Sequence, residues 1–248
     1  MNYAIASQKG GVGKTTTAVS LAHGLSRRGK RVLIVDTDTQ NHVVECLGID
    51  TEASLYDVVI DEMNVNDAIV EARPNLFVLA GGQNVAKLRR FIQLAEVEAE
   101  YVLTDALSSA AEQFDIVIID SSPAWDLLAV NVLFFAKRVI VPVELDVLAV
   151  NGLFKYTKQI GRLSKRSTVA QLHTILPTMV NASFARTDEL LTQLTDYFGS
   201  ELIAPPIRTS SRLAECPAHK QTIYEYAAAD RAVSDYEKLV DRILQDFE

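Results

Sequence analysis

The sequence has few of the features that mark secreted, metal-binding or membrane-spanning proteins. It contains only two cysteines in 248 residues, Cys46 and Cys216, and neither stands in a C-x-x-C or Cys/His spacing typical of a metal site. No apolar run is long enough to span a bilayer, and no signal peptide, repeat or low-complexity tract is present. We therefore expect a soluble, cytosolic protein with two reduced, structural thiols.

Basic residues are outnumbered by acidic ones, and the formal net charge is −8. This balance argues against a protein that nucleic acid coats over its whole surface. A local basic face is still compatible with it, because five cations fall within residues 155–166: Lys155, Lys158, Arg162, Lys165 and Arg166. A solvated helix face and a polyanion-binding surface explain this cluster equally well.

Strand and helix patterns alternate along the chain. Short apolar runs predict strands at residues 3–6, 31–35, 76–80, 114–120, 138–143, 174–180 and 202–204. The stretches between them are mostly helical in pattern, including residues 41–73 and 85–112. This alternation predicts an α/β fold with a doubly wound, mostly parallel sheet flanked by helices. With 48% apolar residues and no linker-like shift in composition, residues 1–248 are expected to form a single domain.

Residues 9–16 form a glycine-rich loop, K-G-G-V-G-K-T-T, between the first predicted strand and a helical pattern over residues 15–28. In such a loop the backbone N–H groups turn inward around an anion, and the helix N-terminus adds partial positive charge. Lys14 is placed to contact the β- and γ-phosphates of a nucleotide, and the Thr15 hydroxyl to contact Mg²⁺. The loop residues that we expect to hold ATP are Lys9, Gly10, Gly11, Val12, Gly13, Lys14, Thr15 and Thr16.

The loop has a second lysine, Lys9, although Lys14 already serves it. Lys9 would bring like charges together unless it points to a phosphate held by another subunit. The first glycine of the usual G-x-x-x-x-G-K-[ST] pattern is missing, because Gln8 stands at its position. The two lysines therefore predict a dimer.

Carboxylates follow two of the predicted strands. Ligands of parallel sheets gather at the carboxyl ends of the strands, which places Asp36, Asp38 and Asp120 near the phosphates. Asp120 ends an apolar strand in the Walker B arrangement and is expected to hold Mg²⁺ through a water, with Thr15. For Asp36 two hypotheses remain: a metal-site carboxylate, or a carboxylate that only caps the turn.

The loop resembles the deviant Walker A motif of the ParA/MinD group of ATPases, in which the extra lysine, here Lys9, is called the signature lysine. The similarity covers nearly the whole chain and continues through residues 36–40 (D-T-D-T-Q), 120–123 (D-S-S-P) and 207–215 (I-R-T-S-S-R-L-A-E). The last segment is more similar to the DNA-partition branch than to the membrane-bound cell-division branch. The resemblance implies a P-loop fold, ATP and Mg²⁺ as cofactors, and a homodimer formed with ATP.

The resemblance also implies roles for single residues. Asp38 would place the attacking water and form the catalytic set with Lys9 and Lys14, and Pro206 and Ile207 would pack on adenine. Four basic residues are the implied contacts to non-specific DNA: Arg186, Arg208, Arg212 and Lys220.

Residues 121–131 would form the second switch segment. The chain departs from the family pattern there at Ser122 and Asp126. Trp125, in the same segment, is either a dimer contact or a core residue. The basic residues Lys87, Arg89 and Arg90 are expected at the surface rather than in the site.

These features favour an ATP-dependent partition or positioning ATPase that binds DNA as a dimer and is released when a ParB-like or cargo-adaptor protein stimulates hydrolysis. The cargo would be a plasmid, a chromosome or another large body such as a carboxysome, and the ATP state would associate with the nucleoid. The alternatives are a MinD-like membrane-associated regulator and a metabolic ligase or synthase. The predicted last helix has an acidic polar face, with Asp235 on it, which argues against a membrane anchor.

Overall fold

The described part of the chain contains a seven-stranded sheet, in the order β3-β4-β2-β5-β1-β6-β7. The computed structural model describes residues 1–95, 97–181 and 185–247, and the side chains of all of these except 185 and 186. β3 runs antiparallel to β4, and the other neighbouring strands are parallel. The strands are β1 (Asn2–Ile5), β2 (Val32–Asp36), β3 (Ile69–Arg73), β4 (Leu76–Leu79), β5 (Ile116–Asp120), β6 (Arg138–Glu144) and β7 (Gln171–Thr178).

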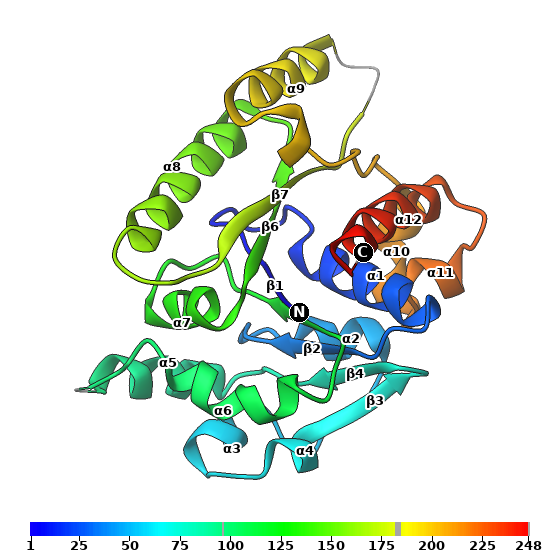
Figure 1. Ribbon diagram of the computed structural model, residues 1–248. Helices are drawn as coiled ribbons and strands as arrows, with labels where there is room; N and C mark the ends of the chain where they lie inside the picture. Colours follow the sequence, from blue (N-terminus) through cyan, green and yellow to red (C-terminus); the bar gives the residue numbers. More distant parts are fainter. Residues whose placement is uncertain (96, 182–184, 248) are drawn as a thin grey trace.

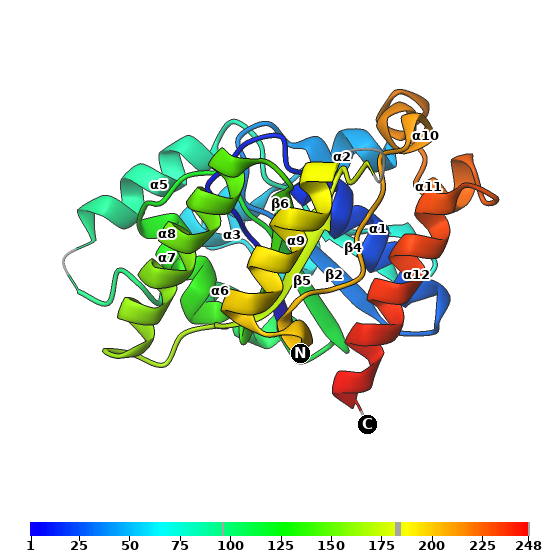
Figure 2. The same ribbon diagram turned by 90° about the horizontal axis from the view of Figure 1, so that it is seen from above.

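Helices cover both faces of the sheet, as the alternating pattern predicted (Figures 1 and 2). One face carries α1 (Lys14–Arg27), α2 (His42–Leu47), α10 (Ser211–Glu215), η2 (Cys216–His219), α11 (Ile223–Tyr226), α12 (Arg231–Leu244) and η3 (Gln245–Phe247). The other carries α3 (Leu55–Ile60), α4 (Val65–Ala68), α5 (Val85–Leu94), α6 (Val102–Ala111), α7 (Leu127–Phe135), α8 (Val147–Ser164) and α9 (Ala185–Phe198). The predicted doubly wound α/β fold is confirmed.

The central strands are apolar because both of their faces are covered. Along β5, Ile116 and Ile118 pack toward α1 and α12, whereas Val117 and Ile119 pack toward the α5–α8 side. Each fully buried side chain of this kind contributes about 1.5–3 kcal/mol to folding. The carboxyl end of β5 is Asp120, which this packing holds 1% exposed.

The predicted helical stretch over residues 41–73 is wrong at its end. Residues 69–73 form β3, an edge strand that pairs with β4 through a tight turn at Pro74 and Asn75. Asn75 has a φ of 63°, in the left-handed region that asparagine tolerates. The turn and the β-branched pair Ile69 and Val70 were the signals for a hairpin.

Two other boundaries differ from prediction. The helical pattern over residues 85–112 is divided between α5 and α6, because the chain turns extended at Ala95. The last predicted strand, residues 202–204, is reduced to the 3₁₀ turn η1 (Ser200–Leu202) and an isolated bridge between Ile203 and Ile175. Pro205 and Pro206 follow at once, and a proline has no N–H with which to extend the pairing.

The last helix, α12, packs against α1. Its buried stripe includes Tyr236, Leu239, Val240 and Ile243, as the sequence periodicity predicted. Asp235, predicted on the polar face, is instead 1% exposed, because it binds Arg208. In the described residues no helix is both long and apolar enough to cross a membrane.

The two cysteines, distant in sequence, lie on the wall of one small cavity between α1, α2 and η2. Burial raises the pKa of Cys46 to about 12 and that of Cys216 to about 11. Both groups are therefore protonated thiols at neutral pH, consistent with the predicted structural role.

Candidate nucleotide site

The glycine-rich loop joins β1 to α1 and has the backbone shape of an anion cradle. Gly11 and Gly13 have φ values of 75° and 82°, in the left-handed region that favours glycine. Gly13 is the N-cap of α1, so the first N–H groups of that helix open toward the loop. The side chain of Lys14 lies across the loop, where its Nζ donates a hydrogen bond to the Lys9 carbonyl at 3.1 Å. Burial lowers the pKa of Lys14, and a phosphate would restore it by stabilising the ammonium.

Asp36 and Asp120 meet at the carboxyl ends of β2 and β5, where they are direct neighbours across the sheet. The Thr15 hydroxyl donates to Asp120 Oδ2 at 2.6 Å, while Asp120 Oδ1 is buried without a hydrogen-bond partner among the described residues. Burial and the charge of Asp36 raise the pKa of Asp120 well above its ordinary value. A free carboxylate oxygen beside a threonine hydroxyl is a donor set that suits Mg²⁺, so the residues fit the metal.

Asp36 also caps the turn after β2. Its Oδ1 accepts from the Asp38 N–H at 2.8 Å, and its Oδ2 from the Val43 N–H at 3.4 Å. Burial raises the pKa of Asp36 to about 6. The turn-capping hypothesis is thus supported by geometry, and a metal role for Asp36 stays a prediction.

Asp38 lies in the loop after β2, half-buried, with its Oδ1 accepting from the Gln40 N–H at 3.1 Å. Gly81, after β4, packs against this loop. A Cβ on Gly81 would lie 2.7 Å from the Asp38 carbonyl and 2.8 Å from the Asp36 carbonyl. Gly82 adds a hydrogen bond from its N–H to the Asp38 carbonyl at 3.0 Å. The sequence analysis missed this role; the signal was the Gly-Gly pair at the end of a strand that neighbours β2.

Lys9 does not join Lys14 over the loop. Its Nζ binds Glu144 Oε2 at 2.8 Å and also binds Asp146. Hydrogen bonds to Asp146 and Glu144 raise the pKa of Lys9, and Lys9 in turn lowers the pKa of Asp146. Asp146 is also the N-cap of α8, accepting from the Ala149 N–H at 2.9 Å. Gln8 reaches the same helix through a 2.6 Å hydrogen bond to Gln159.

A cavity of about 250 Å³ opens beside the loop and α1. Its lining includes Gly13 and Thr16 from the loop, the predicted adenine contact Ile207, and the side chains of Met179 and Leu213. Pro206, also predicted to contact adenine, lies outside the residues that line this cavity. The apolar lining next to a phosphate cradle suits a purine base.

The second switch segment is held by α5. Arg89 Nη2 donates to Ser122 Oγ at 2.5 Å, and Arg89 Nη1 lies 3.4 Å from Asp126 Oδ2. The expectation that Arg89 lies at the surface is therefore wrong: its side chain is 23% exposed and binds both residues at which the segment departs from the family pattern. Trp125 is partly buried and packs edge-on against Tyr156 of α8, with 5.6 Å between ring centroids.

Comparison with known proteins agrees with this geometry. The family described as AAA domain matches residues 2–174. The chain is 32% identical over 252 residues to the sporulation initiation inhibitor protein Soj of Bacillus subtilis, covering 97% of this chain and 96% of Soj. It is 30% identical over 249 residues to the chromosome partitioning protein ParA of Caulobacter vibrioides, covering 97% of this chain and 92% of that protein.

The chain belongs to the ParA/MinD group of P-loop ATPases. The fold is shared with the crystal structure of cobyrinic acid a,c-diamide synthase from Mycobacterium smegmatis with bound ATP analogue and magnesium. That chain is 27% identical, with a TM-score of 0.84 and coverage of 99% of this chain and 95% of the other. Bound nucleotide and magnesium in this relative agree with the cofactors predicted from the phosphate loop.

In this ParA/MinD-type fold, the residues predicted to contact DNA have different surroundings. Arg208 forms a bidentate pair with Asp235, with distances of 2.9 and 2.8 Å, so its guanidinium is already engaged. Arg212 is exposed but lies 3.0 Å from Glu215. The side chain of Arg186 lies outside those that the structure describes.

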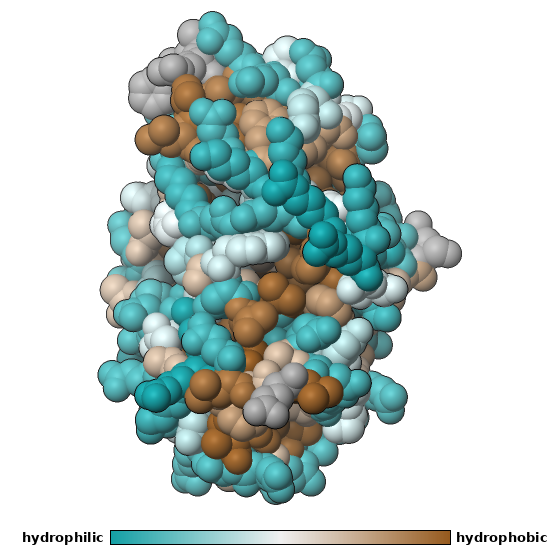
Figure 3. Space-filling view, turned by 90° about the vertical axis from the view of Figure 1, so that its left-hand side faces the viewer, coloured by the Kyte–Doolittle hydropathy of each residue, from teal (hydrophilic) through white to brown (hydrophobic). Residues whose placement is uncertain are grey.

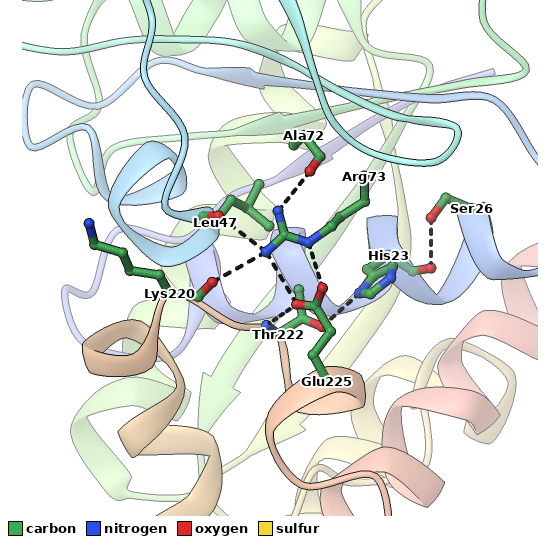
Figure 4. Close-up of polar contacts among 8 residues, drawn as sticks. All are labelled: His23, Ser26, Leu47, Ala72, Arg73, Lys220, Thr222 and Glu225. Carbon is green, nitrogen blue, oxygen red and sulfur yellow. Dashed lines mark hydrogen bonds and ion pairs between the residues drawn. The ribbon is translucent and has the colours of Figure 1, made fainter.

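Lys220 begins a segment, residues 220–225, that a polar cluster anchors (Figure 4). Arg73 binds Glu225 at 2.5 Å and donates to the Lys220 carbonyl at 3.2 Å. In the same cluster, Nδ1 of His23 on α1 lies 2.6 Å from Oγ1 of Thr222. The Lys220 ammonium points away from this cluster into solvent. Of the three predicted DNA contacts whose side chains the structure describes, Lys220 is the one that forms no ion pair with a described carboxylate.

Proposed function

We propose that this ParA/MinD-group protein is a Mg²⁺-dependent ATPase with weak intrinsic activity that dimerises around two ATP molecules and binds DNA without sequence preference in that state. Stimulated hydrolysis would release it. The observation that carries the proposal is the pair of lysines: Lys14 lies over its own loop, whereas Lys9 lies outside it on two carboxylates at the α8 end. Because both ion pairs are exposed and weak, a phosphate of a second subunit would compete for Lys9. The names of the relatives, which include a partition protein, support the same function.

Phosphoryl transfer to water requires positioning and charge neutralisation more than covalent chemistry. Lys14 and the loop N–H groups would hold the phosphates, and Lys9 of the other subunit would add charge in the transition state. Asp38, in the turn after β2, would orient the water. Thr15 and Asp120 would hold Mg²⁺, which supplies charge neutralisation when bound.

The partner that stimulates hydrolysis would be a ParB-like or cargo-adaptor protein, with a plasmid, a chromosome or another large body as cargo. We place the protein in the cytoplasm, on the nucleoid in its ATP state. A MinD-like membrane role is the alternative, and pelleting of the ATP form with anionic liposomes would favour it. A second alternative is a synthase role, for which the observation is the similarity to a synthase. ATP hydrolysis that depends on a small carboxylate substrate, and not on DNA or an adaptor, would support it.

The test combines sedimentation, single-turnover hydrolysis and duplex binding with ATP, ADP or no nucleotide. The wild type should dimerise and bind duplex only with ATP. Asp38→Ala should keep both properties while hydrolysis falls on the order of 10²-fold or more, because the water is no longer oriented. Asp61→Ala, at an exposed position, is the control. Equal duplex affinity in the three nucleotide states would exclude nucleotide gating, and unchanged hydrolysis in Asp38→Ala would exclude its role.

A further inference from the structure

Helix α8 presents a row of cations on the face shown in Figure 3, where a hydrophilic band crosses the molecule between apolar areas. From Val147 to Thr187 the sequence has no Asp or Glu. Within this stretch five cations, which we call the α8 basic ridge, are all exposed: Lys155, Lys158, Arg162, Lys165 and Arg166. Lys155, Lys158 and Arg162 have i, i+3, i+7 spacing, which puts them on one side of the helix.

The cations of the ridge lack ion pairs with the described carboxylates. Other arginines of the chain are engaged: Arg73 with Glu225, Arg138 with Asp246, and Arg208 with Asp235. The neighbouring α9 carries Asp188, Glu189 and Asp196, yet none of these lies within ion-pair distance of a ridge cation. In a protein of net charge −8, this concentration of unpaired positive charge is a local field that attracts polyanions.

The ridge has a firm support. Leu153, Tyr156 and Ile160, on the opposite side of α8, are buried in the core. Beside the ridge lies an open groove of about 580 Å³ between α8 and α9, lined by Asn151, Phe154, Lys155, Lys158, Gln193 and Tyr197. Phe154 packs against Tyr197 and Phe198 with ring centroids 4.6 and 5.4 Å apart. The groove therefore offers ammonium, amide and phenol donors on a rigid aromatic floor.

We propose that the α8 basic ridge is a contact surface for the phosphate backbone of duplex DNA. The proposal rests on the proposed function, which makes DNA the partner, and it assigns the contact to cations that the family resemblance did not mark. Lysine, arginine, asparagine, glutamine and tyrosine are the side chains that bind phosphate oxygens. Lys155 to Arg162 spans about 10 Å along the helix, and that length of duplex carries about six phosphates.

Two observations favour a duplex over an acidic peptide. A peptide takes most of its affinity from apolar anchors that enter fully desolvated pockets. The rings in the groove are instead packed on one another, and the cations continue beyond it along the helix to residues 165 and 166. An extended line of charge matches a regular phosphate backbone.

The ridge is also coupled to the nucleotide loop. Gln8 binds Gln159 in the middle of α8, and Lys9 binds Asp146 at its N-cap. Movement of Lys9 to a phosphate of a second subunit would break its ion pair with Asp146, the N-cap residue of the helix that carries the ridge. Duplex binding through α8 would thereby respond to nucleotide.

The test compares two triple variants with the same change in charge. Lys155→Gln, Lys158→Gln and Arg162→Gln together remove ridge cations, while Lys87→Gln, Arg90→Gln and Lys137→Gln together remove exposed cations elsewhere. Duplex affinity is titrated against salt with ATPγS, and dimerisation, ATP hydrolysis and melting are measured on the same samples. The ridge variant should bind duplex more weakly at every sequence, with the log–log salt slope flattened by up to about five units per dimer at about 0.9 per contact. The control should keep the wild-type slope, and both should dimerise.

Equal slopes for ridge variant and wild type, or equal losses in ridge and control variants, would overturn the ridge assignment while leaving the ATPase proposal intact. Binding of poly-glutamate is measured on the same variants. If the ridge variant loses poly-glutamate binding but keeps its duplex binding, the DNA assignment is overturned in favour of an acidic protein partner. If the wild type neither dimerises nor hydrolyses ATP, the proposed function itself fails. A wild-type dimer that hydrolyses ATP but binds no duplex would overturn the ridge assignment and the DNA-binding part of the proposed function, and would leave the ATPase part intact.

Discussion

Lys9 and Lys14 are five residues apart on one loop, yet their surroundings differ. Lys14 is 8% exposed and reaches only the backbone of its own loop, while Lys9 is paired with Glu144 and Asp146 at the start of α8. An exposed pair of this kind is worth at most about 1 kcal/mol each, so a phosphate can compete for the lysine. Lys14 therefore suits ground-state binding of the phosphates, and Lys9 suits a contact made on dimerisation.

We predict that Lys9→Ala loses ATP-dependent dimerisation and that hydrolysis falls on the order of 10²-fold, because one transition-state charge is missing. Binding of ATP to the monomer should change little, since Lys14 and the loop N–H groups remain. Sedimentation with ATP and nucleotide binding to the monomer distinguish the two effects. Lys87→Ala on the surface of α5 is the matched control, and a Lys9→Ala protein that dimerises and turns over normally would exclude the role in a second subunit.

At the scale of elements, the phosphate-side loops are held by contacts from strands and helices elsewhere in the chain. β4 ends in Gly81, which touches the carbonyls of Asp36 and Asp38, and α5 supplies Arg89 to the second switch segment. Each loop is therefore supported by an element that carries none of the predicted catalytic residues. Loosening the support should change the chemistry more than it changes folding.

Arg89→Gln should release Ser122 and Asp126 from α5 and make the second switch segment more mobile. We expect ATP binding to be retained and stimulated hydrolysis to fall about 5- to 50-fold, because the segment no longer has one resting position. Hydrogen exchange over residues 121–131 would report the mobility directly. Arg90→Gln, one position further along α5 and exposed, provides the control; unchanged exchange in Arg89→Gln would contradict the support role.

Gly81→Ala should strain the loop that carries Asp38, because the new methyl would lie within 3.0 Å of two backbone carbonyls that have little room to move. We expect a loss of about 1–3 kcal/mol in the free energy of unfolding and slower single-turnover hydrolysis. Gly161→Ala on α8, where a Cβ would have nothing within 4 Å, should instead gain up to about 1 kcal/mol. Denaturant unfolding of both variants measures the contrast, and a neutral Gly81→Ala would mean that the loop adapts.

At the scale of the molecule, the C-terminal segment closes over the helix that follows the phosphate loop. α12 packs along α1, and residues 220–225 are tied to α1 and β3 through His23, Thr222, Glu225 and Arg73 (Figure 4). The glycine-rich loop, the cavity beside it and Lys220 are thus parts of one packed unit. His23 is a buried titratable group in this unit, so we expect the stability of the unit to depend on pH.

Burial lowers the pKa of His23, with Arg27 and Arg73 acting in the same direction and Glu225 opposing them. The folded pKa lies below the unfolded value of about 6.5, so its contribution to stability is present above that pH and is lost as pH falls through the folded pKa. We predict that His23 lowers the free energy of unfolding from pH 7 to 5, by at most about 1.4 kcal/mol per pH unit, while Asp36, whose pKa burial raises to about 6, acts in the opposite direction over the same range.

His23→Gln should flatten that pH dependence, whatever its effect on stability at pH 7. His42→Gln, at an exposed position, is the matched control for the loss of one imidazole. His173, whose pKa burial also lowers, and Asp36 and Asp120, whose pKa values burial raises, should contribute to the slope in wild type and in both variants, so only the difference between the curves reports on His23. Urea unfolding at half-unit steps of pH measures the slopes, and parallel curves for His23→Gln and wild type would contradict the assignment.

The amino-acid sequence by itself determined the phosphate loop, the strand-end carboxylates Asp36 and Asp120, and the alternation of buried strands with helices. These features are local: a glycine loop between strand and helix, or an apolar run that ends in Asp, carries its chemistry within a few residues. Only the tertiary structure decided that Lys9 lies on Glu144 and Asp146, that Arg89 supports the second switch segment, and that Arg208 is engaged by a buried Asp235. Each of these contacts joins segments more than 25 positions apart, and whether two such side chains meet depends on how the helices pack across the sheet, which no local pattern records.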